Sequence, residues 1–118
     1  MKFLNLTPHP IVLRRADGSD LTIAPRPAEE GGSARVSSTH GAQVGDANGV
    51  PVFSAPAWGE VTGLPAPEAE TIYIVSGLVL GRVTGRPDVC GPGTGPADGP
   101  VRNADGQVVA VTRLIQAG

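Results

Sequence analysis

The sequence predicts a mainly β fold, in which residues 1–118 form a single domain built as a small barrel or sandwich of short strands with at most one short helix. Composition is the first reason. The chain holds 17 glycines and 12 prolines, which interrupt any long helix, yet 40% of its residues are hydrophobic and only 17% are charged. Disordered chains show the opposite balance. The second reason is that an Asp-Gly pair stands between two β-prone runs near each end of the chain, a strong hairpin signal.

The first hairpin is expected over residues 10–24. A strand over 10–15 leads into a turn at Asp17 and Gly18, two residue types that tolerate positive φ angles. The return strand alternates, with Leu21 and Ile23 on one face.

The second hairpin is expected over residues 101–115, with its turn at Asp105 and Gly106. Its return strand is longer and has apolar residues on both faces. Strands of that kind are typical of the middle of a sheet, so we expect this one to be central.

The chain between the hairpins is expected to alternate between loops and short strands. We predict loops over 25–32 and 63–70, an edge strand over 34–39, and short strands over 50–55 and 60–62, the last two joined through Trp58.

Residues 71–75 are the most β-prone run and are expected to form a core strand. The next stretch, 76–83, fits either a continued strand or about two helical turns. We favour the helix, with Ser76 as its N-cap. Its expected inward-facing residues are Leu78, Leu80 and Val83.

Residues 84–100 are so rich in glycine and proline that we expect no regular element there beyond one or two paired residues. Loops of this length within a domain are uncommon and often functional. The glycines at 91–95 are able to present backbone amides to an anion, and Arg86 and Arg102 flank them with side chains suited to bidentate contacts. The candidate ligand-binding residues are Thr7, His9, Ser76, Arg86, Asp88, Thr94 and Arg102. The alternative is that Arg86 and Asp88 form a local ion pair that pins the loop.

Other kinds of chemistry find little support. Two histidines and one cysteine, Cys90, give no zinc-binding spacing, so we expect no metal and no cofactor. No nucleophile and base can be paired, so no catalytic residue is assigned. A net charge of −2 with few aromatic residues argues against nucleic-acid binding. No apolar run approaches the ~20 residues of a membrane span, and a lone cysteine suits a reducing cytosol.

Three stretches also resemble a known group of proteins. They are Asn5-Leu-Thr-Pro-His-Pro10, Tyr73-Ile-Val-Ser76, and Arg86-Pro-Asp-Val89 followed by a Gly/Pro loop and an Arg-Asn-x-Asp-Gly-Gln hairpin. Together they resemble small proteins encoded by bacteriophages and prophages. That resemblance implies no established activity and no catalytic residue. It implies a context in which accessory proteins bind host proteins or signalling molecules, or form minor virion parts.

We therefore expect a non-catalytic phage-type accessory protein of the bacterial host cytosol that binds or sequesters a small anionic or nucleotide-like ligand. One alternative is a structural or protein-interaction module, such as a minor virion component or an inhibitor of a host protein. Its contact surface would be the 84–100 loop and the Trp58 segment. The other is a small hydrolase or transferase using Ser76 or His9. A homo-oligomer stays open, because small binding proteins often build sites between subunits.

Overall fold

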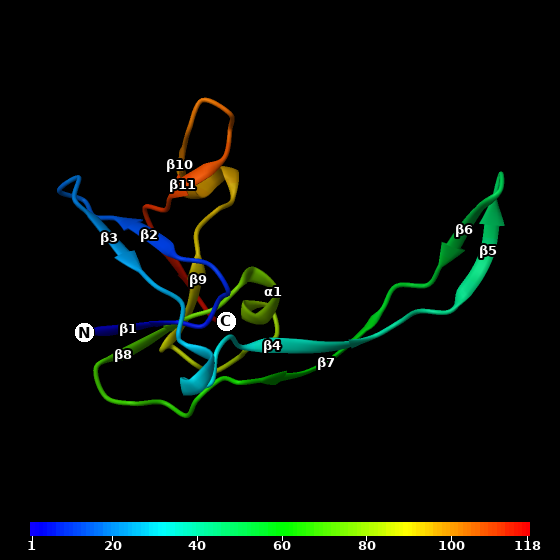
Figure 1. Ribbon diagram of the computed structural model, residues 1–118, viewed down its shortest axis with the longest axis horizontal. Coiled ribbons are helices and arrows are strands. Elements are labelled where there is room, and N and C mark those ends of the chain that lie inside the picture. Colours follow the sequence, from blue (N-terminus) through cyan, green and yellow to red (C-terminus); the bar gives the residue numbers. More distant parts are fainter.

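A four-stranded sheet lies at the centre of the molecule in this computed structural model, which describes residues 1–118 (Figure 1). The strands lie in the order β1 (Lys2–Asn5), β8 (Thr71–Ile74), β9 (Val89–Pro92) and β12 (Leu114–Gln116). The first three are mutually parallel, and β12 runs antiparallel to β9. Parallel neighbours need a crossover connection; the one between β8 and β9 contains the helix α1 (Gly77–Leu80).

Strand β8 is central because different elements cover its two faces. On one face, Tyr73 and Val75 belong to a cluster that reaches α1 and the chain segments around residues 34–36 and 61–64. On the other face, Ile74 packs against Ile11 and Val111. The first cluster consists of Leu6, Ala34, Tyr73, Val75, Val79, Val83 and Val89.

The remaining strands pair two by two. The hairpins and pairs are β2 (Ile11–Arg14) with β3 (Asp20–Ile23), β4 (Arg35–Thr39) with β7 (Ala57–Thr62), β5 (Gln43–Ala47) with β6 (Val50–Phe53), and β10 (Val101–Arg102) with β11 (Val108–Ala110). Two short 3-10 helices span Ala28–Glu30 and Pro96–Asp98.

The predicted mainly β fold with one short helix is confirmed: 42% of the residues lie in strands, and α1 is the one α-helix. The strands form several small sheets, and none of these closes into a barrel. The first predicted hairpin is confirmed, because β2 and β3 pair antiparallel. Both predicted Asp-Gly turns are also confirmed, since Gly18 and Gly106 have positive φ angles.

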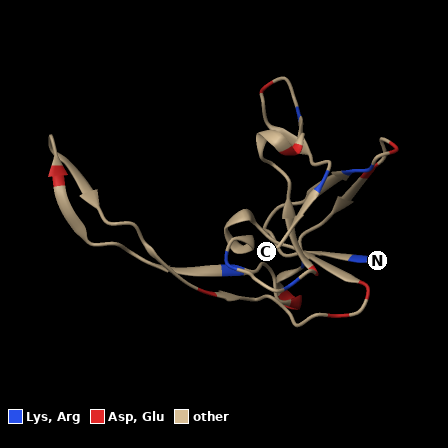
Figure 2. Ribbon diagram, turned by 180° about the vertical axis from the view of Figure 1, so that it is seen from behind, with Lys and Arg blue, Asp and Glu red and all other residues tan.

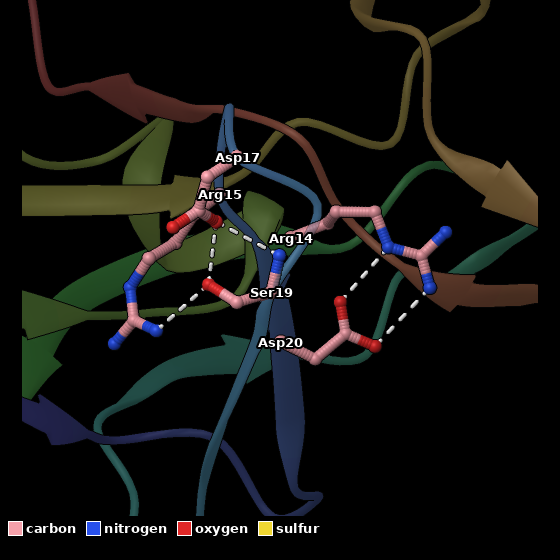
Figure 3. A network of polar contacts seen from close by, with 5 residues as sticks. All are labelled: Arg14, Arg15, Asp17, Ser19 and Asp20. Atoms are coloured by element: carbon pink, nitrogen blue, oxygen red, sulfur yellow. Dashed lines mark hydrogen bonds and ion pairs between the residues drawn. The ribbon is translucent and has the colours of Figure 1, made fainter.

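Polar contacts close the tip of the β2–β3 hairpin, as Figure 3 shows. The guanidinium of Arg14 donates two hydrogen bonds to Asp20, its cross-strand partner, at 2.8 and 3.1 Å. The backbone N–H and the hydroxyl of Ser19 donate to Asp17 Oδ1 at 2.8 and 2.6 Å, and Arg15 donates to the Ser19 hydroxyl. These groups are exposed and satisfy one another, so the network stabilises the turn.

A long arm leads away from the rest of the molecule (Figure 1). We call residues 37–60 the arm and the remaining residues the body. The molecule measures 54 × 38 × 28 Å and its radius of gyration is 17.0 Å, whereas a compact domain of this length has about 13.5 Å. The predicted strands at 34–39, 50–55 and 60–62 are present as β4, β6 and β7, but β5 was not predicted.

The prediction that residues 84–100 hold no regular element beyond one or two paired residues is wrong, because a four-residue strand forms there. Strand β9 lies inside this segment and pairs on both sides, with β8 and with β12. Its glycine serves close packing: a Cβ on Gly91 would lie 3.0 Å from Leu80 Cδ2 and 3.4 Å from the Val75 carbonyl oxygen. Gly91 therefore allows close packing where the sheet meets α1, although its presence made the segment look irregular.

Two further expectations are corrected. The long return strand of the second hairpin is split into β11 and β12, and β12 lies at an edge of the main sheet and not in its centre. The split allows Val111 to pair with Leu13 of β2. In α1, Ser76 is the N-cap, as predicted, but Leu78 points outward. The helix has a single turn, and Val79 and Val83, four residues apart, occupy the side that faces the core.

Asn5 is the buried polar centre of the body, with 1% of its surface exposed. Its side-chain amide donates to the carbonyl oxygens of His9 (2.7 Å) and Ile23 (3.0 Å). Its side-chain oxygen accepts from the backbone N–H and the hydroxyl of Thr7, at 2.9 and 2.6 Å. One residue thereby joins β1, the following turn and the end of β3.

We expect Asn5→Ala to lower the free energy of unfolding by about 2–3 kcal/mol, because it removes four hydrogen bonds at a buried site and takes away the acceptor of the buried Thr7 N–H. Urea unfolding monitored by circular dichroism measures this change. Asn103→Ala is the matched control, since Asn103 makes comparable bonds with residues 105 and 107 in an exposed turn. It should cost about 1 kcal/mol or less. Equal losses in the two variants would contradict a special role for Asn5.

Candidate functional site

One cavity of about 370 Å³ opens on the body. It lies where β2 meets the segment after β11: the Arg14 N–H donates to the Val111 carbonyl at 2.8 Å, and the Val111 N–H donates to the Val12 carbonyl at 2.9 Å. Its lining residues are His9, Pro10, Ile11, Val12, Pro92, Thr94, Val108, Val109, Ala110 and Val111. No lysine, arginine or carboxylate is among them, so the cavity suits an apolar occupant.

The residues predicted to bind a ligand do not come together around this cavity. His9 and Thr94 line it. Thr7 is buried and bonded to Asn5, and the Ser76 hydroxyl accepts from the Val79 N–H at the start of α1. Arg102 donates to the Gly106 carbonyl within its own exposed hairpin. Each of these three polar side chains has a structural partner.

Arg86 and Asp88 form the local ion pair that the sequence left as an alternative. Arg86 Nε and Nη2 donate to the two Asp88 carboxylate oxygens at 2.8 and 2.9 Å. Nη2 also donates to the Pro65 carbonyl at 2.9 Å, and the guanidinium carbon lies 6.0 Å from the centre of the Tyr73 ring. The Tyr73 hydroxyl in turn donates to the Ala66 carbonyl. The cluster thus fastens the 63–70 loop beside the start of β9.

The titration properties of this cluster follow from its contacts. The hydrogen bonds between the two side chains hold the pKa of Asp88 below its usual value and raise the pKa of Arg86. Burial is the main cause of the raised pKa of Tyr73, and it is also the main cause of the raised pKa of Cys90. Cys90 is a buried free thiol in β9 and is therefore protonated near neutral pH, which fits a small apolar core residue rather than a nucleophile.

The arm presents exposed apolar side chains that sequence reasoning largely missed. Of its 24 residues, none is buried and only Gly41 is half-buried. Half of the molecule's exposed large hydrophobic side chains lie here: Val44, Val50, Val52, Phe53 and Trp58. Of these, only Trp58 had been assigned to a contact surface.

The far end of the arm has two different faces. Gly45 pairs with Val52, and Ala47 with Val50. Because directly paired residues share a face, these four residues form one uncharged apolar surface, which we call the tip face. Asp46 lies on the other face, and it is the arm's one acidic residue before Glu60 at its base (Figure 2).

A recognisable signal for the arm was present in the sequence. Asn48 and Gly49 both have positive φ angles, 52° and 85°, as a two-residue hairpin turn between β5 and β6 requires. Asn-Gly between β-prone residues is the strongest short-range signal for such a hairpin. It predicts β5 but not that the hairpin stands free of the body.

Comparisons with other proteins add no assignment: no family model, no curated protein and no solved structure matches this chain. No three His, Cys, Asp or Glu side chains lie close enough together to hold a metal ion. No helix has the length and apolar character needed to cross a membrane.

The Arg86–Asp88 pair should appear in the acid dependence of stability. Because the folded-state pKa of Asp88 is depressed, the pair contributes stability that is present above the unfolded-state value of about 3.9 and is lost as the pH falls through the folded-state value. Asp88→Asn should therefore lower the melting temperature at neutral pH and lose less stability than wild type on acidification.

Melting temperatures at about pH 7 and about pH 3 test this expectation. Asp20→Asn is the control, because the side chains of the Arg14–Asp20 pair are 38% and 40% exposed and solvent screens the attraction. It should change the acid dependence less. An acid dependence of Asp88→Asn identical to that of wild type would refute the contribution of this pair.

Proposed function

We propose that the protein is a non-catalytic interaction module that binds a protein partner through its arm. The observation that supports this proposal is that 24 consecutive residues, whose strands pair only with one another or with the strand ends at 35–36 and 61–62, bury none of their side chains in the body. Among the functions considered from sequence, the geometry favours the interaction module. A phage accessory role, as a virion part or an inhibitor of a host protein, fits it.

The energetics of a two-stranded hairpin support a partner. Such a hairpin is at best marginally stable by itself in water, because it has no covered face. The arm nonetheless exposes Phe53 at 59% and Trp58 at 40%. Aromatic side chains of this kind supply much of the binding energy in protein interfaces, and contiguous exposed apolar surface marks sites of interaction.

The ligand-binding and enzymatic alternatives have less support. A small anion needs cationic side chains or free amides, and the cavity has no arginine or lysine in its lining. Arg86 already makes three hydrogen bonds within the chain. Hydrolysis or transfer needs a nucleophile held by a base, whereas Ser76 accepts the N–H of Val79 as a helix cap.

Site-specific photo-cross-linking tests the interaction. With p-benzoylphenylalanine in place of Phe53, illumination in cells that express the protein should produce one dominant covalent complex with a protein. The reason is that an aromatic ring at the end of the arm would lie in the interface. Mass spectrometry of the complex identifies the partner.

The matched control carries the same photo-reactive residue at position 68, which is exposed in the 63–70 loop and lies outside the cavity lining. It should give little or no cross-linking to that partner. Replacement of residues 40–56 by an Asn-Gly turn should leave the body folded, because the arm has no buried residue. No protein cross-linked through position 53 above the position-68 background would refute the proposal.

A further inference from the structure

We infer that the arm's partner is a second copy of this chain, whose body cavity receives the tip face. This inference rests on the proposed function, that the arm binds a protein, and it names that protein. Each copy would donate one arm and receive another, so that two distinct surfaces of every chain become covered.

The exposed area of the chain supports two covered surfaces. The molecule exposes 7456 Å², whereas a compact monomer of 11.9 kDa exposes about 6,000 Å². The excess of about 1,500 Å² is close to two standard interface surfaces of about 800 Å² each. An exchange in which every copy gives an arm and receives one covers two such surfaces per chain.

The number of available residues is also adequate. Stable interfaces use about 20–30 residues from each side, and the arm supplies 24 that are not buried within its own chain. The tip face would form the centre of this contact, and the neighbouring arm residues would extend it over the surface around the cavity.

The tip face and the cavity have matching chemistry. The tip face consists of Gly45, Ala47, Val50 and Val52 and has no charged group. The cavity is also without charged lining residues, and Val108 and Val109 at its edge are 37% and 46% exposed. Joining these surfaces buries apolar area on both sides and leaves no unpaired charge in the contact.

The arm's edges are poorly suited to the alternative, in which two arms pair strand to strand. Pro51 in β6 has no N–H to donate, and its partner across the hairpin, Asp46, places a charge on β5. A register irregularity between Gln43 and Gly45 interrupts β5 further. Proline, charge and bulges are the features that protect edge strands from pairing. Contact is therefore assigned to a face of the hairpin, and the tip face is the one that carries no charge.

The arm does not lie at the cavity of its own chain. Figure 1 shows the arm extending away from the side of the body where β2 and β11 lie. The cavity lies at those two strands. Reciprocal exchange therefore requires another copy and closes as a dimer or a ring.

A mixing experiment tests the inference. Val52→Asp places a charge on the tip face and leaves the cavity intact, whereas Val109→Asp does the reverse. Sedimentation velocity should show wild type as an oligomer and each variant alone as a monomer, because an unpaired carboxylate in an apolar contact should weaken association by about 100-fold or more. Mixed in equal amounts, the two variants should form a 1:1 dimer, since one intact arm meets one intact cavity.

Leu78→Asp is the matched control. Leu78 is 48% exposed on α1, close to the 42% of Val52 and the 46% of Val109, and lies on neither surface. This variant should assemble like wild type. Circular dichroism confirms that each variant is folded; Val50→Asp and Val108→Asp replace any variant that is not.

Four results would overturn the inference: wild type that stays monomeric at every concentration, Val52→Asp that still assembles, Val109→Asp that still assembles, or a mixture that stays monomeric. Assembly of Val109→Asp by itself would indicate arm-to-arm contact, because such a contact does not use the cavity. A monomeric wild type together with a cross-link from position 53 to a different protein would remove this inference and keep the proposed function. Absence of any cross-link would remove the proposed function itself.

Discussion

The buried amide of Asn5 is the contact on which the arrangement of the body depends. Its side chain joins the end of β1 to the His9 and Ile23 carbonyls, so the β2–β3 hairpin lies over the Ile74 face of the sheet. Its backbone carbonyl accepts from the Arg26 N–H, and the next carbonyl, that of Leu6, accepts from the Ala34 N–H. Residues 26–34, which lead into the arm, are thus hydrogen-bonded at both ends to the neighbouring residues Asn5 and Leu6.

Burial divides the molecule into two parts with different roles. All 17 buried residues lie in the body, where two apolar clusters cover opposite faces of β8. The arm contributes nothing to either interior, yet it holds half of the exposed large hydrophobic side chains. The core is therefore built without the arm, and the exposed apolar side chains of the arm add nothing to it.

Local signals in the sequence were sufficient for elements whose cause is local. The Asp-Gly turns, the Ser76 cap and the β-prone run at 71–75 each depend on residues within a few positions of one another. The ion pair between Arg86 and Asp88 could also be offered as an alternative from the sequence, because the two residues are only two positions apart. Strands β1 and β9 could not be predicted from local signals, because their partners lie far along the chain: β1 pairs with β8, and β9 pairs with β8 and β12.

The sequence by itself determined the mainly β class, the hairpin turns and the helix cap, since turn geometry and strand preference are properties of neighbouring residues. Only the tertiary structure decided that Gly91 belongs to a central strand, where a side chain would fit tightly against Leu80 of α1. The tertiary structure also decided that the predicted ligand residues lie apart, because a cavity forms where segments distant in the sequence meet. It also left the 37–60 hairpin free of the body. In the sequence, the hydrophobic residues of this hairpin look like core residues. Whether they are exposed depends on whether another part of the fold packs against them, which the sequence does not show.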